Sequence, residues 1–269
     1  MAKQTSLLES FSPVRYLLNY LLGFIIGLGN ALFFLGEIIL CLFKGRVRFS
    51  EVLKQIYEQG IQSIVIIALT SFATGVVLAL QGYVMLERFG AKEYVAHLVA
   101  LSLVRELSPV FGALTFSGKA GARIAAELGT MSVNDQILAT RTMGVDPVEF
   151  LIVPRIVACF LVLPILVVFS ETIGIAGGYF IGITEANIPG SFYIARTLSA
   201  IGYVDFFSGF IKTFFFAILI GWICCYQGYQ TRGGSLGVGK FTTKAVAFCY
   251  ILIVVSNTIL TKIILTLWG

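Results

Sequence analysis

Long apolar segments separated by short polar loops constrain this chain more than any other feature of its sequence. Five of them have the length of a bilayer crossing, namely 61–86, 94 to about 116, 148–183, 205 to about 229 and about 245–268. At ~1.5 Å per helical residue, about 20 residues cross a ~30 Å hydrocarbon core. The 269 residues are 58% hydrophobic and 12% charged, whereas soluble domains are ~45–50% apolar. The sequence therefore predicts an all-α integral membrane protein.

Basic residues indicate which loops face the cytoplasm, because Lys and Arg are retained on that side of a membrane. They gather in two places, residues 44–54 and 232–244. The loops 87–93 and 184–204 carry no basic excess and are predicted to lie outside. Five spans with the C-terminus outside follow from this alternation.

A further apolar run, Val14–Phe43, has two interpretations. If it crosses the membrane, the N-terminus lies outside; if it lies in the interface or re-enters, the N-terminus lies inside. Its periodicity favours neither placement. The predicted organisation is an N-terminal cytoplasmic or interfacial helical segment, residues 1–55, followed by a transmembrane domain, residues 56–269.

The polar stretch between the second and third spans predicts a short helix at about 131–144. Ser132 to Asp135 fits a capping box, so the helix is predicted to begin near Val133. Gly144 suits the left-handed residue that closes a helix, and Asp146-Pro147 suits a turn that opens the next one. A helix of about three turns at ~3.6 residues each cannot cross a membrane. Local chemistry fits an ordinary interfacial helix and a docking helix for a cytosolic partner alike.

Three charged residues fall inside predicted spans: Arg105, Glu106 and Lys212. Each costs ~2.5–3.5 kcal/mol on insertion scales, so such residues face a cavity or a partner. Adjacent helical residues point ~100° apart, so Arg105 and Glu106 are predicted to face different sites. Glu106 is a candidate partner of Lys212, while Arg105 addresses a cavity or a second copy of the chain. The pair either fixes helix register or forms a polar patch for a lipid headgroup or for gating.

Other site chemistries have little support in the sequence. Gly234–Lys240 has the spacing of a phosphate-binding loop, but Phe241 replaces the Ser or Thr that holds magnesium, so a flexible cytoplasmic loop is predicted. The five cysteines and His97 lie in apolar surroundings without metal-ligand spacing and are interpreted as packing residues. No nucleic-acid face is implied. A membrane-embedded enzyme would need a nucleophile, a carboxylate pair or a metal cluster, and none is recognisable.

One long motif resembles a known family. The run LVALSLVRELSPVFGALTFSGKAGARIAAELGTM, residues 98–131, is followed by Met143 to Pro147 and by Pro154-Arg155. Together they resemble the MlaE/YrbE permease family, the membrane subunits of ABC transporters that move phospholipids together with MCE-domain proteins. The similarity extends from the region of Gln81 to the final span and so covers most of the chain.

The resemblance implies a homodimer in the bacterial inner membrane. Each subunit would have an N-terminal membrane-embedded interfacial helix and five spans. Partners would be a cytosolic ABC ATPase subunit, often a small STAS-domain protein, and a periplasmic MCE-domain hexamer, in a system that maintains outer-membrane lipid asymmetry. ATP and Mg would be bound by the partner ATPase, and this chain would hold no cofactor, no metal and no catalytic residue.

The resemblance also implies roles for particular residues. The coupling helix that seats in the ATPase would carry Val133, Asp135, Ile137, Arg141 and Met143. A phospholipid cavity at the dimer interface would be lined by Leu78, Met85, Leu86 and Leu107, with the charged residues Arg105, Glu106 and Lys212 nearby. Asn257 stands where the family pattern allows an acid, with Lys262 one turn beyond, so the charge network is expected to differ there. The alternative function is a self-contained secondary transporter or channel, which usually shows an internal repeat.

Overall fold

The computed structural model describes residues 13–43 and 48–268, and the chain divides into two compact units between Arg46 and Val47. In the first unit, residues 13–43 form one unbroken helix, α2 (Pro13–Phe43). It begins with a proline, which is favoured at the first helical position because its missing N–H needs no partner there. The segment is therefore a helix, which is compatible with both predicted placements, across the membrane or in its interface.

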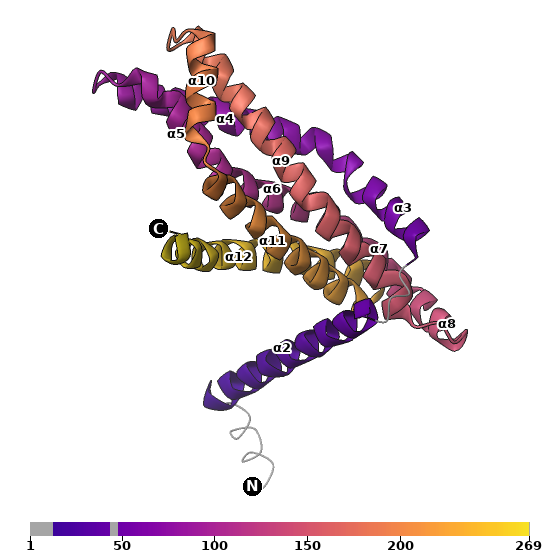
Figure 1. The fold of residues 1–269 in the computed structure, drawn as a ribbon. Coiled ribbons are helices and arrows are strands. Elements are labelled where there is room, and N and C mark those ends of the chain that lie inside the picture. The colour runs from indigo at the N-terminus through magenta and orange to yellow at the C-terminus, as the bar shows by residue number, and fades with distance from the viewer. Residues whose placement is uncertain (1–12, 44–47, 269) are drawn as a thin grey trace. The chain divides into compact units, whose positions relative to one another are not determined.

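The described residues of the second unit form helices and no strand (Figure 1). Its elements are α3 (Phe49–Gln59), η2 (Ile61–Ser63), α4 (Ile64–Glu87), η3 (Lys92–Tyr94), α5 (Val95–Ser102), η4 (Leu103–Leu107), α6 (Ser108–Phe116), η5 (Ser117–Gly121), α7 (Ala122–Val133), α8 (Gln136–Thr142), η6 (Val148–Ile152), α9 (Val153–Thr184), α10 (Gly190–Ala200), α11 (Tyr203–Tyr229) and α12 (Gly234–Trp268). The boundary predicted at residue 55 thus falls inside α3, which the structure places in the second unit. Val52, Gln55 and Gln59 of α3 are buried, and this helix packs against α9.

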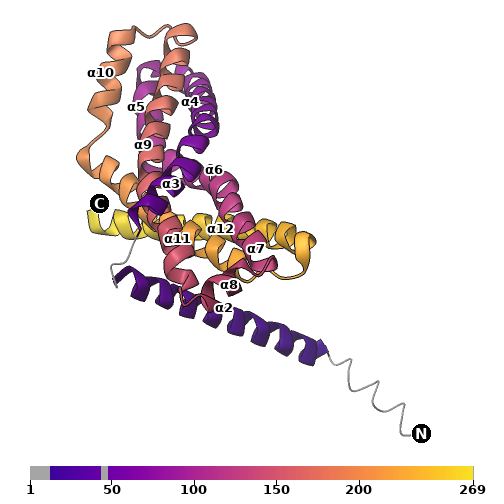
Figure 2. The same cartoon turned by 90° about the vertical axis from the view of Figure 1, so that its right-hand side faces the viewer.

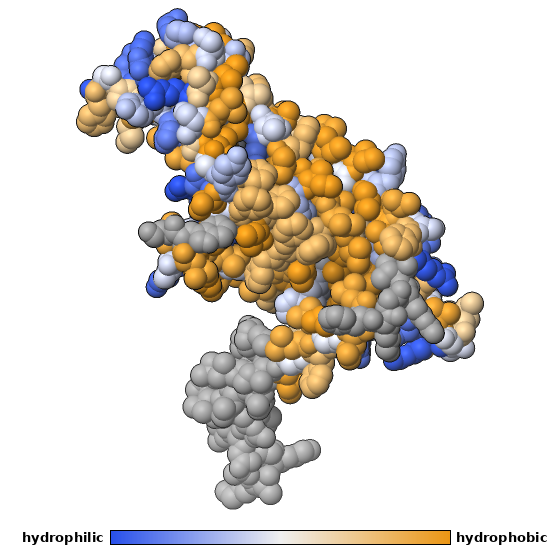
Figure 3. Space-filling view, in the orientation of Figure 1, coloured by the Kyte–Doolittle hydropathy of each residue, from blue (hydrophilic) through white to orange (hydrophobic). Residues whose placement is uncertain are grey.

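Five helical segments of the described chain are long and apolar enough to cross a membrane. They are Phe49–Glu87, Lys92–Val133, Val148–Thr184, Tyr203–Tyr229 and Gly234–Leu267. Helices α8 and α10 lie at opposite ends of the second unit (Figures 1 and 2). Apolar side chains cover the face between these ends, and hydrophilic residues gather at both (Figure 3). The predicted all-α fold with five spans is confirmed, and the chain is a multi-pass membrane protein.

The predicted helix start near Val133 is wrong. The second span continues through α7 to that residue, and α8 begins only at Gln136, after Asp135 in a left-handed conformation with φ 55°. Ser132 does not act as a cap, because its hydroxyl lies 3.2 Å from the carbonyl oxygens of both Tyr229 and Thr231. The pattern resembled a capping box, but the hydroxyl ties this turn to the end of α11 instead.

The predicted end of the short helix, and the turn that follows it, are confirmed. Gly144 has a φ of 77°, as the closing residue of a helix should. The Val148 amide donates to the Asp146 carboxylate at 2.9 Å, and the turn opens the helical segment that leads into α9.

Two segments predicted to be loops are helical. Residues 190–200 form α10, whose buried Tyr193, Thr197 and Ala200 recur at helical spacing, and which packs on α5 and α9. Residues 234–240 form the first turns of α12 rather than a flexible loop. Each glycine costs ~1 kcal/mol in a helix, but most helical stability comes from tertiary packing, and the 35-residue α12 packs on α7 and α11.

Helices α4 and α9 touch at their backbones. A Cβ atom added to Gly75 would overlap the carbonyl oxygen of Gly174. The hydroxyls of Ser71 and Ser170 lie 2.6 Å apart across the same contact. Small residues permit this approach, which is typical of helix pairs in membranes. The glycines of α9 at this crossing are contact points within a continuous helix.

We predict that Gly75→Ala destabilises the fold by about 1–3 kcal/mol, the usual cost of overpacking. This is a stringent test because alanine is intrinsically the better helix former by ~0.8–1.0 kcal/mol. Gly239→Ala is the matched control, since a Cβ atom there meets nothing within 4 Å. Thermal unfolding of the purified protein should show a lower midpoint for Gly75→Ala only. Equal midpoints for both variants would contradict the close contact.

Candidate functional site

The charged site is built on a wide helical turn, η4, in the second span. This π-helical turn contains Arg105 and Glu106, and such turns are frequent at functional sites. Helix α11 lies directly against it: a Cβ atom on Gly209 would overlap the carbonyl oxygen of Val104. Asp205 and Lys212 lie four residues before and three residues after Gly209, so both are on the helix face that meets η4.

Two ion pairs join η4 to α11. The Lys212 ammonium lies 2.7 Å from Glu106 Oε1, which is the pair that the sequence suggested. Arg105 Nε donates to Asp205 Oδ1 at 2.6 Å. The sequence assigned Arg105 to a cavity or a second copy and did not identify Asp205 as its partner. The two adjacent residues do face different sites, but these sites lie on one helix, two turns apart.

The pair between Glu106 and Lys212 belongs to a larger polar cluster. Lys212 is 2% exposed and also donates to the Arg105 carbonyl at 3.1 Å and to Thr261 Oγ1 at 2.8 Å. The Thr261 hydroxyl donates to Glu106 Oε1, and Asn257 Nδ2 donates to Glu106 Oε2, both at 2.9 Å. We call Glu106, Lys212, Asn257 and Thr261 the Glu106 network. The network connects η4, α11 and α12. Asn257, which stands where the family pattern allows an acid, joins it as a neutral hydrogen-bond donor.

A groove opens beside the Glu106 network. Its volume is ≈ 480 Å³, and it is lined by Glu106, Asn257, Thr258, Thr261, Lys262, Leu265 and Thr266. We call it the α12 groove. Its volume lies within the ~300–1,000 Å³ of small-molecule sites. Charged, hydroxyl and aliphatic side chains therefore meet at one open site within the span-forming helices.

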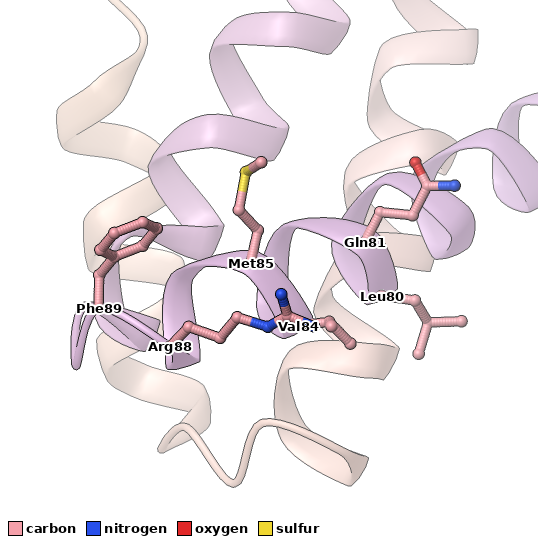
Figure 4. Close-up of a pocket in the computed structure, with 6 residues that line it drawn as sticks. All are labelled: Leu80, Gln81, Val84, Met85, Arg88 and Phe89. Atoms are coloured by element: carbon pink, nitrogen blue, oxygen red, sulfur yellow. The ribbon is translucent and has the colours of Figure 1, made fainter.

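The apolar residues predicted to line a cavity lie in two different environments. Met85 is 64% exposed and lines a second groove of ≈ 520 Å³. This groove is formed by residues of α4 and the turn after it: Leu80, Gln81, Val84, Met85, Arg88 and Phe89 (Figure 4). Leu78, Leu86 and Leu107 are instead partly buried and pack against the core cluster that includes Ala79, Val95 and Leu103.

The predicted coupling residues surround α8 at the other end of the unit. Arg141 and Asp135 are exposed, and Met143 is 78% exposed. Val133 is partly buried at the end of α7, and Ile137 is 8% exposed, so Ile137 anchors α8 to the bundle. Leu138, which the sequence analysis did not select, is 59% exposed. The exposed residues Leu138, Arg141 and Met143 therefore form an apolar and basic surface, which we call the α8 surface.

The structure also contains a charged cluster that the sequence analysis missed. Arg123 Nε binds Glu127 Oε1 at 2.6 Å, and Arg123 Nη1 donates to Gln62 Oε1 at 2.6 Å. Arg155, which is 5% exposed, lies 3.4 Å from Glu127 Oε2. The cluster joins η2, α7 and α9. In the sequence, the cluster was visible only as charged residues among small and apolar ones in 121–128 and 152–159.

Glu171 is a second residue that the sequence analysis missed. It lies within α9, is 5% exposed, and has no ion-pair or hydrogen-bond partner among residues 13–43 and 48–268. A buried acid inside a span is unusual and costly. Its signal was a single acid in an otherwise apolar run.

No metal centre is formed by the described part of the chain, where no three His, Cys, Asp or Glu side chains come together to hold an ion. The five cysteines are buried. The sulfur atoms of Cys224 and Cys249 lie 3.6 Å apart between α11 and α12.

We predict that Lys212→Met destabilises the protein by on the order of 2–3 kcal/mol. Removing one partner of a buried ion pair costs ~3–5 kcal/mol, and the Glu106 side chain is 36% exposed, which reduces the penalty. The double variant Lys212→Met/Glu106→Gln should recover much of the loss, because it leaves no uncompensated charge. Thermal unfolding of the wild type, Lys212→Met, Glu106→Gln and the double variant gives the coupling free energy between Lys212 and Glu106. Strictly additive changes would contradict the pair.

The comparisons with known proteins agree with this architecture. The family model described as "Permease MlaE" matches residues 52–263. A probable ABC transporter permease protein of Rickettsia typhi is 39% identical over 221 residues, 82% of this chain and 85% of that protein. The intermembrane phospholipid transport system permease protein MlaE of Haemophilus influenzae is 37% identical over 243 residues, 90% of this chain and 93% of that protein.

A plant protein is also similar. The chloroplastic protein TRIGALACTOSYLDIACYLGLYCEROL 1 of Arabidopsis thaliana is 32% identical over 227 residues, 84% of this chain and 65% of that protein. The residues that the family model matches, 52–263, contain η4, α8, α11 and most of α12, and therefore both the Glu106 network and the α8 surface. This chain belongs to the MlaE permease family.

Proposed function

We propose that this chain is the membrane subunit of an ATP-driven phospholipid transporter. The observation that carries the proposal is the Glu106 network, a buried ion pair inside the span-forming helices that opens into the α12 groove. Charged residues inside membrane spans face substrate pathways or partners. The pair of Glu106 and Lys212 meets a groove that is large enough for a lipid headgroup. The name of the Haemophilus influenzae relative, a phospholipid transport system permease, supports the same substrate.

The groove on α4 supplies apolar surface for the same substrate. Met85 and its neighbours Leu80, Val84 and Phe89 are exposed large side chains at one end of a span. Acyl chains would lie against such residues, because burying apolar surface is favourable by roughly 25 cal/mol per Å². The headgroup would lie near the charged residues of the Glu106 network.

Energy would enter at α8. The chain presents Leu138, Arg141 and Met143 there as exposed side chains. Met and Arg are enriched at protein–protein interfaces, so this surface suits a cytosolic ATPase subunit, which would bind ATP and Mg. Ile137 and the contacts of Ser132 with the end of α11 would transmit movement of α8 to the span that carries Lys212.

The remaining partners are proposed by analogy with the family. Two copies of the chain would form a homodimer in the bacterial inner membrane, with the lipid cavity between them. An MCE-domain hexamer would receive or deliver lipid on the periplasmic side, and a small STAS-domain protein would join the ATPase. ATP-driven closure of the two ATPase subunits would move the paired α8 helices and narrow the cavity, forcing a phospholipid between the membrane and the MCE channel.

We predict that Arg141→Ala and Met143→Ala each reduce ATP-dependent phospholipid transport by about tenfold, the effect of losing an interface contact worth ~1.4 kcal/mol. Transport of fluorescent phospholipid in vesicles containing the co-purified complex would be measured with and without ATP. Leu198→Ala is the control, because Leu198 is 70% exposed on α10 at the opposite end. Wild-type ATP-driven transport in both α8 variants would reject the docking role.

A further inference from the structure

The α12 groove carries a net positive charge. Glu106 is the only carboxylate among its lining residues, and it lies 2.7 Å from the buried ammonium of Lys212. These two charges offset each other. Lys262 also lines the groove, is exposed, and has no carboxylate partner among residues 13–43 and 48–268. Its positive charge is therefore left over.

The hydrogen-bond donors of the groove are almost all engaged. The hydroxyls of Thr258 and Thr266 donate to the backbone carbonyls of Val254 and Lys262, and the Thr261 hydroxyl donates to the Glu106 carboxylate. Asn257 Nδ2 donates to Glu106 at 2.9 Å. Besides the second N–H of Asn257 Nδ2, the remaining donor is the Lys262 ammonium, with three N–H groups and no acceptor. An occupant with a strong acceptor and negative charge would satisfy it.

The acceptors of the groove point to the same chemistry. Asn257 Oδ1 is buried with no donor in the described part of the chain, and the threonine oxygens can each accept a further bond. A headgroup hydroxyl can donate to the threonine oxygens without adding positive charge. An ammonium headgroup could also donate, but it would bring a second cation beside Lys262.

We propose that the α12 groove selects phospholipids whose headgroup has a net negative charge and hydroxyl donors, as phosphatidylglycerol has, over zwitterionic phosphatidylethanolamine. The inference rests on the proposed lipid-transport function and adds its headgroup preference. The lipid phosphate binds the Lys262 ammonium, and the headgroup hydroxyls face Asn257 and the threonines. Lys262 lies five residues beyond Asn257, about 7.5 Å along the helix axis, which a phosphoglycerol headgroup can span.

The test uses the full chain, with its co-purified subunits, in vesicles of equal phosphatidylglycerol and phosphatidylethanolamine content. The complex is extracted, and the lipids that remain bound are quantified by mass spectrometry. Wild type should retain phosphatidylglycerol over phosphatidylethanolamine about three- to tenfold, the effect of one charge-assisted hydrogen bond near a surface. Lys262→Gln should lower this ratio to about one, and Lys262→Arg should keep it.

Two further variants separate local charge from total charge. Lys244→Gln removes the same charge from the same helix, 18 residues away, where Lys244 lies over Phe241 and Phe248, and it should keep the wild-type ratio. Asn257→Asp adds an acid to the groove and should lower the ratio. A wild-type ratio of one, or an unchanged ratio in Lys262→Gln, would overturn the selection.

A separate measurement distinguishes the selection from the function on which it rests. ATP-dependent movement of each lipid is followed in the same vesicles. Equal ATP-driven movement and equal retention of both lipids would overturn the headgroup selection and leave the transport function standing. Selective retention without any ATP-dependent movement would overturn the transport function while supporting the charge selection.

Discussion

The contact between Gly209 and the wide turn η4 determines where the charges of this protein can meet. Without a Cβ atom at Gly209, α11 approaches the Val104 carbonyl so closely that Lys212 reaches both the Arg105 carbonyl and the Glu106 carboxylate. A larger residue would separate the helices and leave buried charges unpaired, at a cost of several kcal/mol each. The ion pairs and the helix contact therefore depend on each other.

The rest of the second unit holds this contact in place and links it to α8 and to the α12 groove. Helix α9 packs on α4 through glycines and serines, and on α11 along another face. At one end, Ser132 ties the turn before α8 to the last residues of α11. The α12 groove opens beside Glu106 itself. A displacement of α8 would thus act on the helix that carries Lys212, which is the physical basis of the proposed coupling.

Length and hydropathy were sufficient to predict the five spans, and the cost of intramembrane charge was sufficient to suggest the pair between Glu106 and Lys212. The partner of Arg105 was not predictable, because Asp205 stands at the edge of a loop where an acid needs no partner. The start of α8 was misjudged because a local pattern cannot reveal that the Ser132 hydroxyl binds another helix. Helix α10 was missed because its burial depends largely on α5, which is about 90 residues away in the sequence.

The most direct measurement is affinity purification of the full chain in mild detergent, with mass spectrometry of every protein and lipid that accompanies it. Recovery of an ATP-binding-cassette subunit together with bound phospholipid is the expected result, since the chain has an exposed α8 surface and a polar groove beside a buried ion pair of the span-forming helices. Recovery of a folded chain alone in several detergents, without phospholipid, would contradict the proposal and favour a self-contained secondary transporter.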